Sequence, residues 1–241
     1  MGGALIEGLI ARGLDPKRVR VQDPSPPSEV AALLAKYGIP AEPRIESLSE
    51  APGVILVAVK PQVMDAVFPP VACLAGPQTL TISIAAGRTL QSFEKHLAQG
   101  AAVVRAMPNT PAAIGRGITV CAANAHVTPA AQGLCEALLS AVGEVAWVEK
   151  EELMDAVTAV SGSGPAYVFL LAECLEKAGI AAGLEAGLAK RLARATVSGA
   201  GELLHRSDLD ASVLRQNVTS PGGTTAAALG VLMAEGGLGE L

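Results

Sequence analysis

The 241-residue chain has few aromatic side chains and no excess of positive charge. Phe, Trp and Tyr together make up 2% of the residues, which is too little for the stacking platforms that bind single-stranded nucleic acid. The formal net charge is −5, whereas domains that bind polyanions carry a basic surface. The sequence therefore predicts no nucleic-acid partner.

Long hydrophobic runs are also missing. The longest uninterrupted apolar stretches, such as Val54–Val59 and Ala166–Ala172, fall far short of the ~20 residues that cross a bilayer. The first residues contain Glu7 and no basic cluster, so they lack the pattern of a signal peptide. We expect no membrane partner and a cytoplasmic location.

The sequence lacks cysteine and histidine pairs with metal-binding spacing. No CxxC pair occurs and no histidine has a helical HxxxH partner, although zinc sites and redox dithiols depend on such spacing. We expect no metal site, and we interpret the cysteines as small buried residues in a reducing cytosol. The residues concerned are Cys73, Cys121, Cys135, Cys174, His96, His126 and His205.

Apolar residues make up 50% of the chain and charged residues 17%, so the chain can bury a core, and its length predicts one or two domains. Up to residue 150, β-rich runs alternate with helix-like stretches, which is typical of an α/β domain with a mainly parallel sheet. The expected strands are Arg18–Gln22, Val54–Val59, Leu80–Ile84, Ala102–Arg105, Gly117–Ala122 and Glu144–Val148. The expected helices are Gly3–Arg12, Ser28–Tyr37, Leu90–Leu97 and Pro129–Val142.

After Lys150 the pattern becomes helical throughout. We therefore expect a domain over residues 1–150 and an all-α domain over residues 151–241. Gly179, just past Lys177, has the position of a helix end. The expected helices are Glu151–Val160, Pro165–Ala178, Leu184–Leu204 and Leu209–Val218, and the third has an apolar face of Leu188, Leu192, Ala195 and Gly199.

Ligands of open parallel sheets bind beyond the carboxyl ends of the strands. Three predicted strand ends suit a nucleotide: a lysine before a strand-stopping proline, small residues that let a flat ring approach, and an amide in a proline-fixed turn. A solvent-exposed lysine after a strand, or an ordinary tight connection between two elements, would give the same sequence patterns. The segments are Val59-Lys60-Pro61, Ala85-Ala86-Gly87 and Pro108-Asn109-Thr110-Pro111.

The first residues have the pattern of a glycine-rich phosphate turn that leads into a helix. Of the dinucleotide fingerprint G-x-G-x-x-G, the last glycine alone is present, as Gly2. We therefore expect the preceding strand and glycines to lie upstream of Met1. Asp23 follows a predicted strand about 20 residues after Gly2, where an acid binds the ribose hydroxyls.

Two motifs stand out in the helical region. SGSGPAY, at Ser161–Tyr167, combines glycines, serine hydroxyls and Pro165, which suits a first helical turn. NVTSPGGTT, at Asn217–Thr225, opens a predicted helix, and free N–H groups at a helix start bind anions. The second motif predicts a site for a small carboxylate, although a capped helix with a flexible lead-in is an alternative interpretation.

With AVKP, SIAAG and MPNTP upstream, these motifs resemble those of the pyrroline-5-carboxylate reductase family, and the resemblance extends from Met1 to about Leu232. It implies a Rossmann domain followed by an interlocking helical domain. It also implies reduction of the cyclic imine 1-pyrroline-5-carboxylate to L-proline with NADPH or NADH, the last step of proline biosynthesis. Homodimers, which can assemble into homodecamers, are the implied oligomers.

Site residues follow from the motifs and the resemblance together. Thr225 is the implied catalytic residue and would meet the imine nitrogen. The residues expected around the substrate are Asn217, Ser220, Gly223, Thr224, Thr225 and Ser163. The residues expected at the cofactor are Gly2, Asp23, Ser25, Val59, Lys60, Ala85, Ala86 and Asn109.

Pro24 departs from the family's pattern. Many bacterial members carry arginine there, which would bind the 2′-phosphate of NADPH. Asp23 would repel that phosphate, whereas Ser25 could bind it. The sequence leaves the choice between NADPH and NADH open.

Two other functions are compatible with the sequence. A β-hydroxyacid dehydrogenase has a similar architecture, but it needs a lysine on a helix of the second domain to move the alcohol proton. Lys177 and Lys190 are the helical lysines there. A chain whose nucleotide site lacks its first strand could instead be a non-enzymatic ligand-binding or interaction protein.

Overall fold

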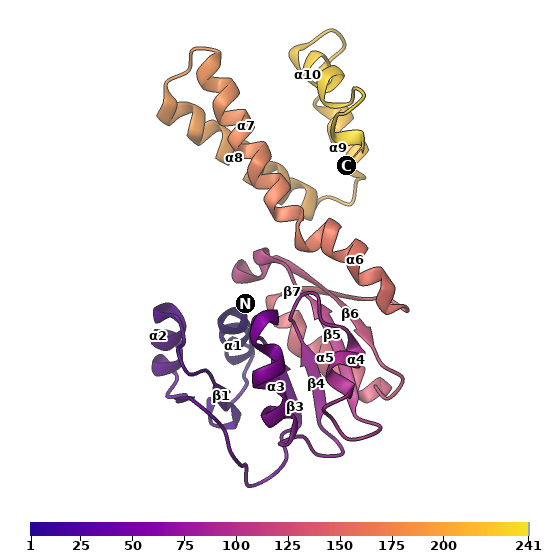
Figure 1. Cartoon of the computed structure of the whole chain (residues 1–241). Coiled ribbons are helices and arrows are strands. Elements are labelled where there is room, and N and C mark those ends of the chain that lie inside the picture. Colours follow the sequence, from indigo (N-terminus) through magenta and orange to yellow (C-terminus); the bar gives the residue numbers. More distant parts are fainter. Residues whose placement is uncertain (241) are drawn as a thin grey trace. The chain divides into compact units, whose positions relative to one another are not determined.

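The computed structural model describes residues 1–240. The chain divides into two compact units, Met1–Ala166 and Tyr167–Leu241 (Figure 1). The first unit contains every strand among the described residues, and the second is helical. The predicted α/β region followed by helices is therefore confirmed.

A five-stranded sheet with the order β3-β4-β5-β6-β7 forms the centre of the first unit. Only the β5–β6 pair is antiparallel among these neighbours, so the sheet is mainly parallel, as predicted. A separate parallel pair, β1-β2, lies outside this sheet. The strands are β1 (Val21–Gln22), β2 (Ala41–Glu42), β3 (Val54–Val57), β4 (Leu80–Ser83), β5 (Ala102–Met107), β6 (Gly117–Ala123) and β7 (Gly143–Trp147).

Helices cover both faces of the five-stranded sheet (Figure 1). On one face, α1 (Gly2–Ala11) and α5 (Pro129–Leu139) pack against β4, β5 and β6 through buried Leu5 and Leu139. On the other face, α3 (Met64–Ala72) and α4 (Leu90–Glu94) bury Phe68 and Phe93 in edge-to-face contact, with ring centroids 5.0 Å apart. All four residues of β4 are buried, as expected for a strand that helices cover on both faces.

The helix α3 has no counterpart among the predicted elements. Pro69 and Pro70 lie inside it, although an interior proline removes a backbone hydrogen bond and costs about 3 kcal/mol. The helix nevertheless buries Met64, Phe68 and Ala72 against the sheet. Tertiary packing therefore overrides a strong local signal against a helix.

The expectation that all the cysteines are buried is wrong for two of them. Cys73 and Cys174 are exposed, while Cys121 and Cys135 lie in the core, and all four are free thiols. The hydrogen bond with Cys135 and burial raise the pKa of the Cys121 thiol far above its usual range. Cys121 therefore stays a neutral core residue at physiological pH.

After β7, the described residues form helices and no further strands. In the first unit these are α6 (Met154–Val157) and a π-helical turn, Thr158–Gly162, that continues it. The long helix α7 (Gly164–Ala181) starts there and extends into the second unit. The second unit also contains α8 (Ala186–Arg206), α9 (Ala211–Asn217) and α10 (Thr224–Leu232). The remaining helix of the first unit is α2 (Ser28–Lys36).

The predicted helix end at Gly179 is wrong. Helix α7 continues past it, and the chain turns at Gly183, where φ is +94°. Gly183 is the glycine that takes the left-handed conformation of a helix stop, which costs little without a Cβ. Gly179 instead lies against Ala189 of α8, where an added Cβ would be 3.2 Å from the Ala189 Cβ.

The apolar face predicted for α8 does not face the rest of its own unit. Leu188 and Leu192 are exposed, whereas Ala189 and Ala193 are the buried residues of this helix. On α7, Phe169 is 61% exposed and Leu170 is 55% exposed. No helix among residues 1–240 has both the length and the apolar character of a membrane span.

Candidate functional site

Three of the predicted cofactor segments lie at one edge of the sheet. Strands β3, β4 and β5 are parallel neighbours, so their carboxyl ends meet at the same edge. We call the segments that follow them, 58–61, 84–89 and 108–110, the carboxyl edge. It contains Val59, Lys60, Ala85, Ala86 and Asn109.

Helix α1 begins at this edge. A Cβ added to Gly2 would lie 3.3 Å from the Cβ of Ala58, so the first turn of α1 lies close to the chain that leaves β3. The first amides of a helix have no intrahelical acceptor and carry partial positive charge. The edge thus combines a helix start with short side chains, which is an arrangement suited to a phosphate.

The loop after β4 has a defined conformation. Ala85 is buried, and its N–H donates to the Oγ of Ser83 at 3.2 Å. Ala86 is exposed, and Gly87 has a φ of +71°, a conformation that side chains other than glycine rarely adopt. These small residues leave backbone exposed at the edge for a flat ring to approach.

A hydrogen bond to the backbone holds the side chain of Asn109 in place. Its Oδ1 accepts the N–H of Ile118 at 3.0 Å, which ties the end of β5 to the start of β6. A short 3-10 helix, Thr110–Ile114, follows with Pro111 in its first turn. The rigid turn predicted at this point is therefore present, with the side chain of Asn109 fixed at its start.

Asp23 and Ser25 lie apart from the main sheet. They follow β1, and the Oδ1 of Asp23 accepts the N–H of Ser25 at 2.9 Å. Helix α1 connects the two regions, since Gly3 of α1 packs against Val30 of α2. Asp23 is half-buried and Ser25 is exposed, so both remain accessible.

A charged network that the sequence analysis missed lies beside the carboxyl edge. Arg105, on β5, has 9% of its side chain exposed, and its guanidinium donates a hydrogen bond to the Oε1 of Glu151 at 2.9 Å. The same oxygen accepts the N–H of Leu90, at the start of α4, at 2.8 Å. Glu151 thus joins the central sheet, the loop after β4 and the first helical turn after β7. No local pattern indicates this network, because its members are far apart in the sequence.

The turn at 217–225 joins α9 to α10 in the second unit. Asn217 is the last residue of α9, Gly222 has a φ of +70°, and Gly223 is the N-cap of α10. Gly223 donates its N–H to the carbonyl of Ser220 at 3.1 Å. This turn exposes Ser220 and Thr224 and leaves Thr225 half-buried at the start of α10.

This turn has the features of an anion site. The N-cap residue, Gly223, has no side chain to cap the helix, and the first intrahelical bond runs from Ala227 N–H to Gly223 O. The amides of Thr224, Thr225 and Ala226 are therefore available to a ligand, and hydroxyls flank them. The structure brings together Asn217, Ser220, Gly223, Thr224 and Thr225.

Ser163 belongs to the first unit, at the junction between the π-helical turn and α7. Its N–H donates to Thr158 O at 2.8 Å, and its carbonyl accepts the N–H of Ala166. The predicted helices Glu151–Val160 and Pro165–Ala178 leave Ser161–Gly164 outside helical structure, and this is wrong for the first two of these residues. Ser161 and Gly162 are part of the helical turn, and a Cβ at Gly162 would collide with Met107 at the end of β5.

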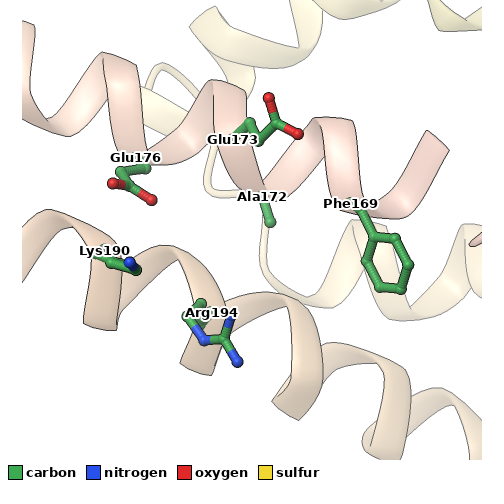
Figure 2. Close-up of a pocket in the computed structure, with 6 residues that line it drawn as sticks. All are labelled: Phe169, Ala172, Glu173, Glu176, Lys190 and Arg194. Carbon is green, nitrogen blue, oxygen red and sulfur yellow. The ribbon is translucent and has the colours of Figure 1, made fainter. Parts of the chain in front are cut away.

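An open recess lies between α7 and α8, and none of the predicted site residues lines it. Glu173 and Glu176 line it from α7, and Lys190 and Arg194 from α8 (Figure 2). The acidic residues of α7 and the basic residues of α8 make it a charged surface of the helix pair. No cluster of three or more histidine, cysteine, aspartate or glutamate side chains suited to a metal occurs in residues 1–240.

Two family models match the chain. Residues 151–240 match the model described as pyrroline-5-carboxylate reductase dimerisation. Residues 1–87 match the model described as NADP oxidoreductase coenzyme F420-dependent. The first match begins just after the last strand of the central sheet, and the second extends from α1 to the loop after β4.

Curated relatives match almost the whole chain. The pyrroline-5-carboxylate reductase of Pseudomonas aeruginosa is 41% identical over 237 residues, which cover 98% of this chain and 86% of the relative. That of a Synechocystis species is 42% identical over 238 residues, with 96% and 87% covered.

Solved structures agree with this likeness. The pyrroline-5-carboxylate reductase of Coxiella burnetii superposes with a TM-score of 0.86 at 36% identity, over 95% of this chain and 85% of that one. The NADP-bound pyrroline carboxylate reductase of Plasmodium falciparum superposes with a TM-score of 0.77 at 29% identity, over 97% and 86%. The chain belongs to the pyrroline-5-carboxylate reductase family.

Proposed function

We propose that this chain reduces 1-pyrroline-5-carboxylate to L-proline with NAD(P)H, the last step of proline biosynthesis. The observation that carries this conclusion is the identity of about two residues in five, over nearly its whole length, with curated reductases of this activity. The chain is an oxidoreductase that acts on a C=N bond. Neither the dehydrogenase nor the non-enzymatic interpretation has comparable support.

The carboxyl edge of β3–β5 is the proposed cofactor site. The close approach of α1 to Ala58 at Gly2 and the small residues Ala85 and Ala86 fit a dinucleotide, because larger side chains would fill this space. Exposed Lys60 would neutralise phosphate charge. The remaining proposed contacts are Val59, Asn109, Asp23 and Ser25.

The turn at 217–225 is the proposed substrate site. The free amides at the start of α10 and the hydroxyls of Ser220 and Thr224 suit the carboxylate of the substrate. We assign Thr225 the role of donating a hydrogen bond to the ring nitrogen, and Asn217, Gly223 and Ser163 the role of shaping the site. The proposal requires the two units to bring both sites to one substrate.

The reaction adds one hydride and one proton across the imine C=N bond. The reduced nicotinamide supplies the hydride when bound, and the proton ends on the ring nitrogen, so that the imine becomes a secondary amine. A protonated imine is already electrophilic, so the residues of this chain need mainly to orient the substrate. This accounts for a site without a general acid–base pair.

Residues 151–240 match a dimerisation domain, and we propose that this chain forms a homodimer through it. The exposed apolar side chains of α7 and α8 support this assembly, because monomers rarely expose such surface. A homodecamer, a cytoplasmic location and a domain boundary near residue 150 are further proposals. Free thiols at all four cysteines are typical of a reducing compartment.

Initial rates with the full chain test the proposed function. We expect oxidation of NADPH or NADH on addition of 1-pyrroline-5-carboxylate, and the ratio of the two kcat/KM values gives the cofactor preference. Hydroxy acids and keto acids are the control substrates, since a β-hydroxyacid dehydrogenase would act on those. Turnover of the control substrates without turnover of the imine would contradict the proposal.

A further inference from the structure

Arg88 connects two of the three segments of the carboxyl edge. Its Nη1 donates to the Oδ1 of Asp65 at 3.0 Å, and its Nη2 donates to the Oδ2 at 2.9 Å. Nη2 also donates to the carbonyl of Pro61 at 2.6 Å. We call these three hydrogen bonds the Arg88 clamp.

The clamp joins the loop after β4 to the turn after β3. Arg88 directly follows Ala85-Ala86-Gly87, Pro61 directly follows Lys60, and Asp65 lies in the first turn of α3. The bidentate geometry fixes the guanidinium in the plane of the carboxylate. The two loops proposed to face the cofactor are therefore held to each other by one side chain.

We propose that Arg88 is a positioning residue for NAD(P)H binding, because its clamp on Asp65 and Pro61 holds the Lys60 turn against the Ala85–Gly87 loop. This inference rests on the proposed cofactor site. The loop has few other anchors of this kind: its far end is tied through Leu90 to Glu151, and its middle contains Gly87 in a left-handed conformation. Without the clamp, the two loops sample arrangements that do not match the cofactor.

The clamp is too exposed to contribute much to overall stability. Asp65 has 63% of its side chain exposed and Arg88 has 22%, and exposed ion pairs contribute little. The hydrogen bonds of Arg88 hold the pKa of Asp65 below its usual range, so the clamp stays charged at neutral pH. A positioning role therefore predicts weaker nucleotide binding at an unchanged Tm, whereas a structural role predicts a lower Tm.

Equilibrium binding of NADPH and NADH to the full chain, measured by calorimetry, tests the proposal. If the arrangement of the two loops that binds the nucleotide becomes less populated, the apparent Kd rises in proportion to that loss of population. For Arg88→Met we expect Kd to rise about two- to fivefold for both nucleotides, with the Tm unchanged. The matched control is Arg12→Met, which removes an exposed hydrogen bond to Ser140 at the far end of α1.

Asp65→Ala separates positioning from direct contact. If Arg88 acts through the clamp, Asp65→Ala weakens both nucleotides, and the double variant binds no more weakly than Arg88→Met alone. Steady-state kinetics should then show a higher KM for the nucleotide and a nearly unchanged kcat.

Unchanged nucleotide affinity in Arg88→Met would overturn the proposal. So would a loss of affinity that is specific to NADPH and absent from Asp65→Ala, because it would mean direct contact of Arg88 with the 2′-phosphate. A fall in the Tm of Arg88→Met that accompanies the loss of affinity would also overturn it, because it would indicate a structural role. Failure of the unsubstituted chain to bind either nucleotide would instead refute the proposed cofactor site itself.

Discussion

Glu151 links three elements beside the carboxyl edge of the sheet, and its removal is expected to destabilise the first unit. Glu151→Ala leaves the guanidinium of Arg105, 9% exposed, without its carboxylate, and leaves the N–H of Leu90 without its acceptor. Breaking a fully buried pair costs about 3–5 kcal/mol. Because Glu151 has 22% of its side chain exposed, water can reach the site, so we expect a loss of about 2–3 kcal/mol.

Urea unfolding followed by circular dichroism at a fixed protomer concentration measures this loss, since the stability of a dimer depends on concentration. Glu152→Ala, at the neighbouring exposed position, is the matched control and should change the free energy of unfolding by no more than about 0.5 kcal/mol. The double variant with Arg105→Met should be more stable than Glu151→Ala alone, because no buried charge is left unpaired. Equal midpoints for Glu151→Ala and Glu152→Ala would refute the reasoning.

Three further predictions concern the helical region. Thr225→Ala should lower kcat/KM for the imine about 30- to 900-fold, the equivalent of ~2–4 kcal/mol, and leave the Kd of NAD(P)H unchanged. Thr225→Ser keeps the hydroxyl and should keep most of the rate. A Thr225→Ala variant as fast as the unsubstituted chain would remove the residue from the mechanism. Glu185 caps α8 by accepting two backbone N–H groups, which lower its pKa. Its stabilising effect is complete above the pKa of the unfolded chain and is lost as the pH falls through the lower folded value, so the difference in Tm between the native chain and Glu185→Gln should close in acid; a pH-independent difference would contradict this. Gly183→Ala should cost about 1 kcal/mol because φ is +94°, whereas Gly133→Ala, in open space on α5, should be neutral or stabilising by thermal unfolding.

The positions of the five main-sheet strands along the chain, and the segments at their ends, could be predicted because each carries a local signal. Proline after Lys60 stops one strand, small residues follow the next, and a proline pair fixes the turn at Asn109. Parallel pairing then brings these ends to one edge. The turn at 217–225 was likewise predictable, since glycine, serine and threonine before an apolar stretch indicate the start of a helix.

Elements that depend on contacts distant in the sequence could not be predicted. Helix α3 contains Pro69-Pro70 and exists because the sheet buries one of its faces. The ion pair of Arg105 with Glu151 and the clamp of Arg88 on Asp65 join residues 46 and 23 positions apart, and no periodicity marks such pairs. Antiparallel pairing of β5 with β6 is set by the short 3-10 connection between them.

The most direct test of the account follows the hydride into the product. The full chain is incubated with 1-pyrroline-5-carboxylate and NADPH or NADH that carries deuterium at both C4 positions, and the proline formed is analysed by mass spectrometry. We predict proline that contains one deuterium, bonded to the carbon of the former imine. Unlabelled proline, or nucleotide oxidation that yields no proline, would contradict the account.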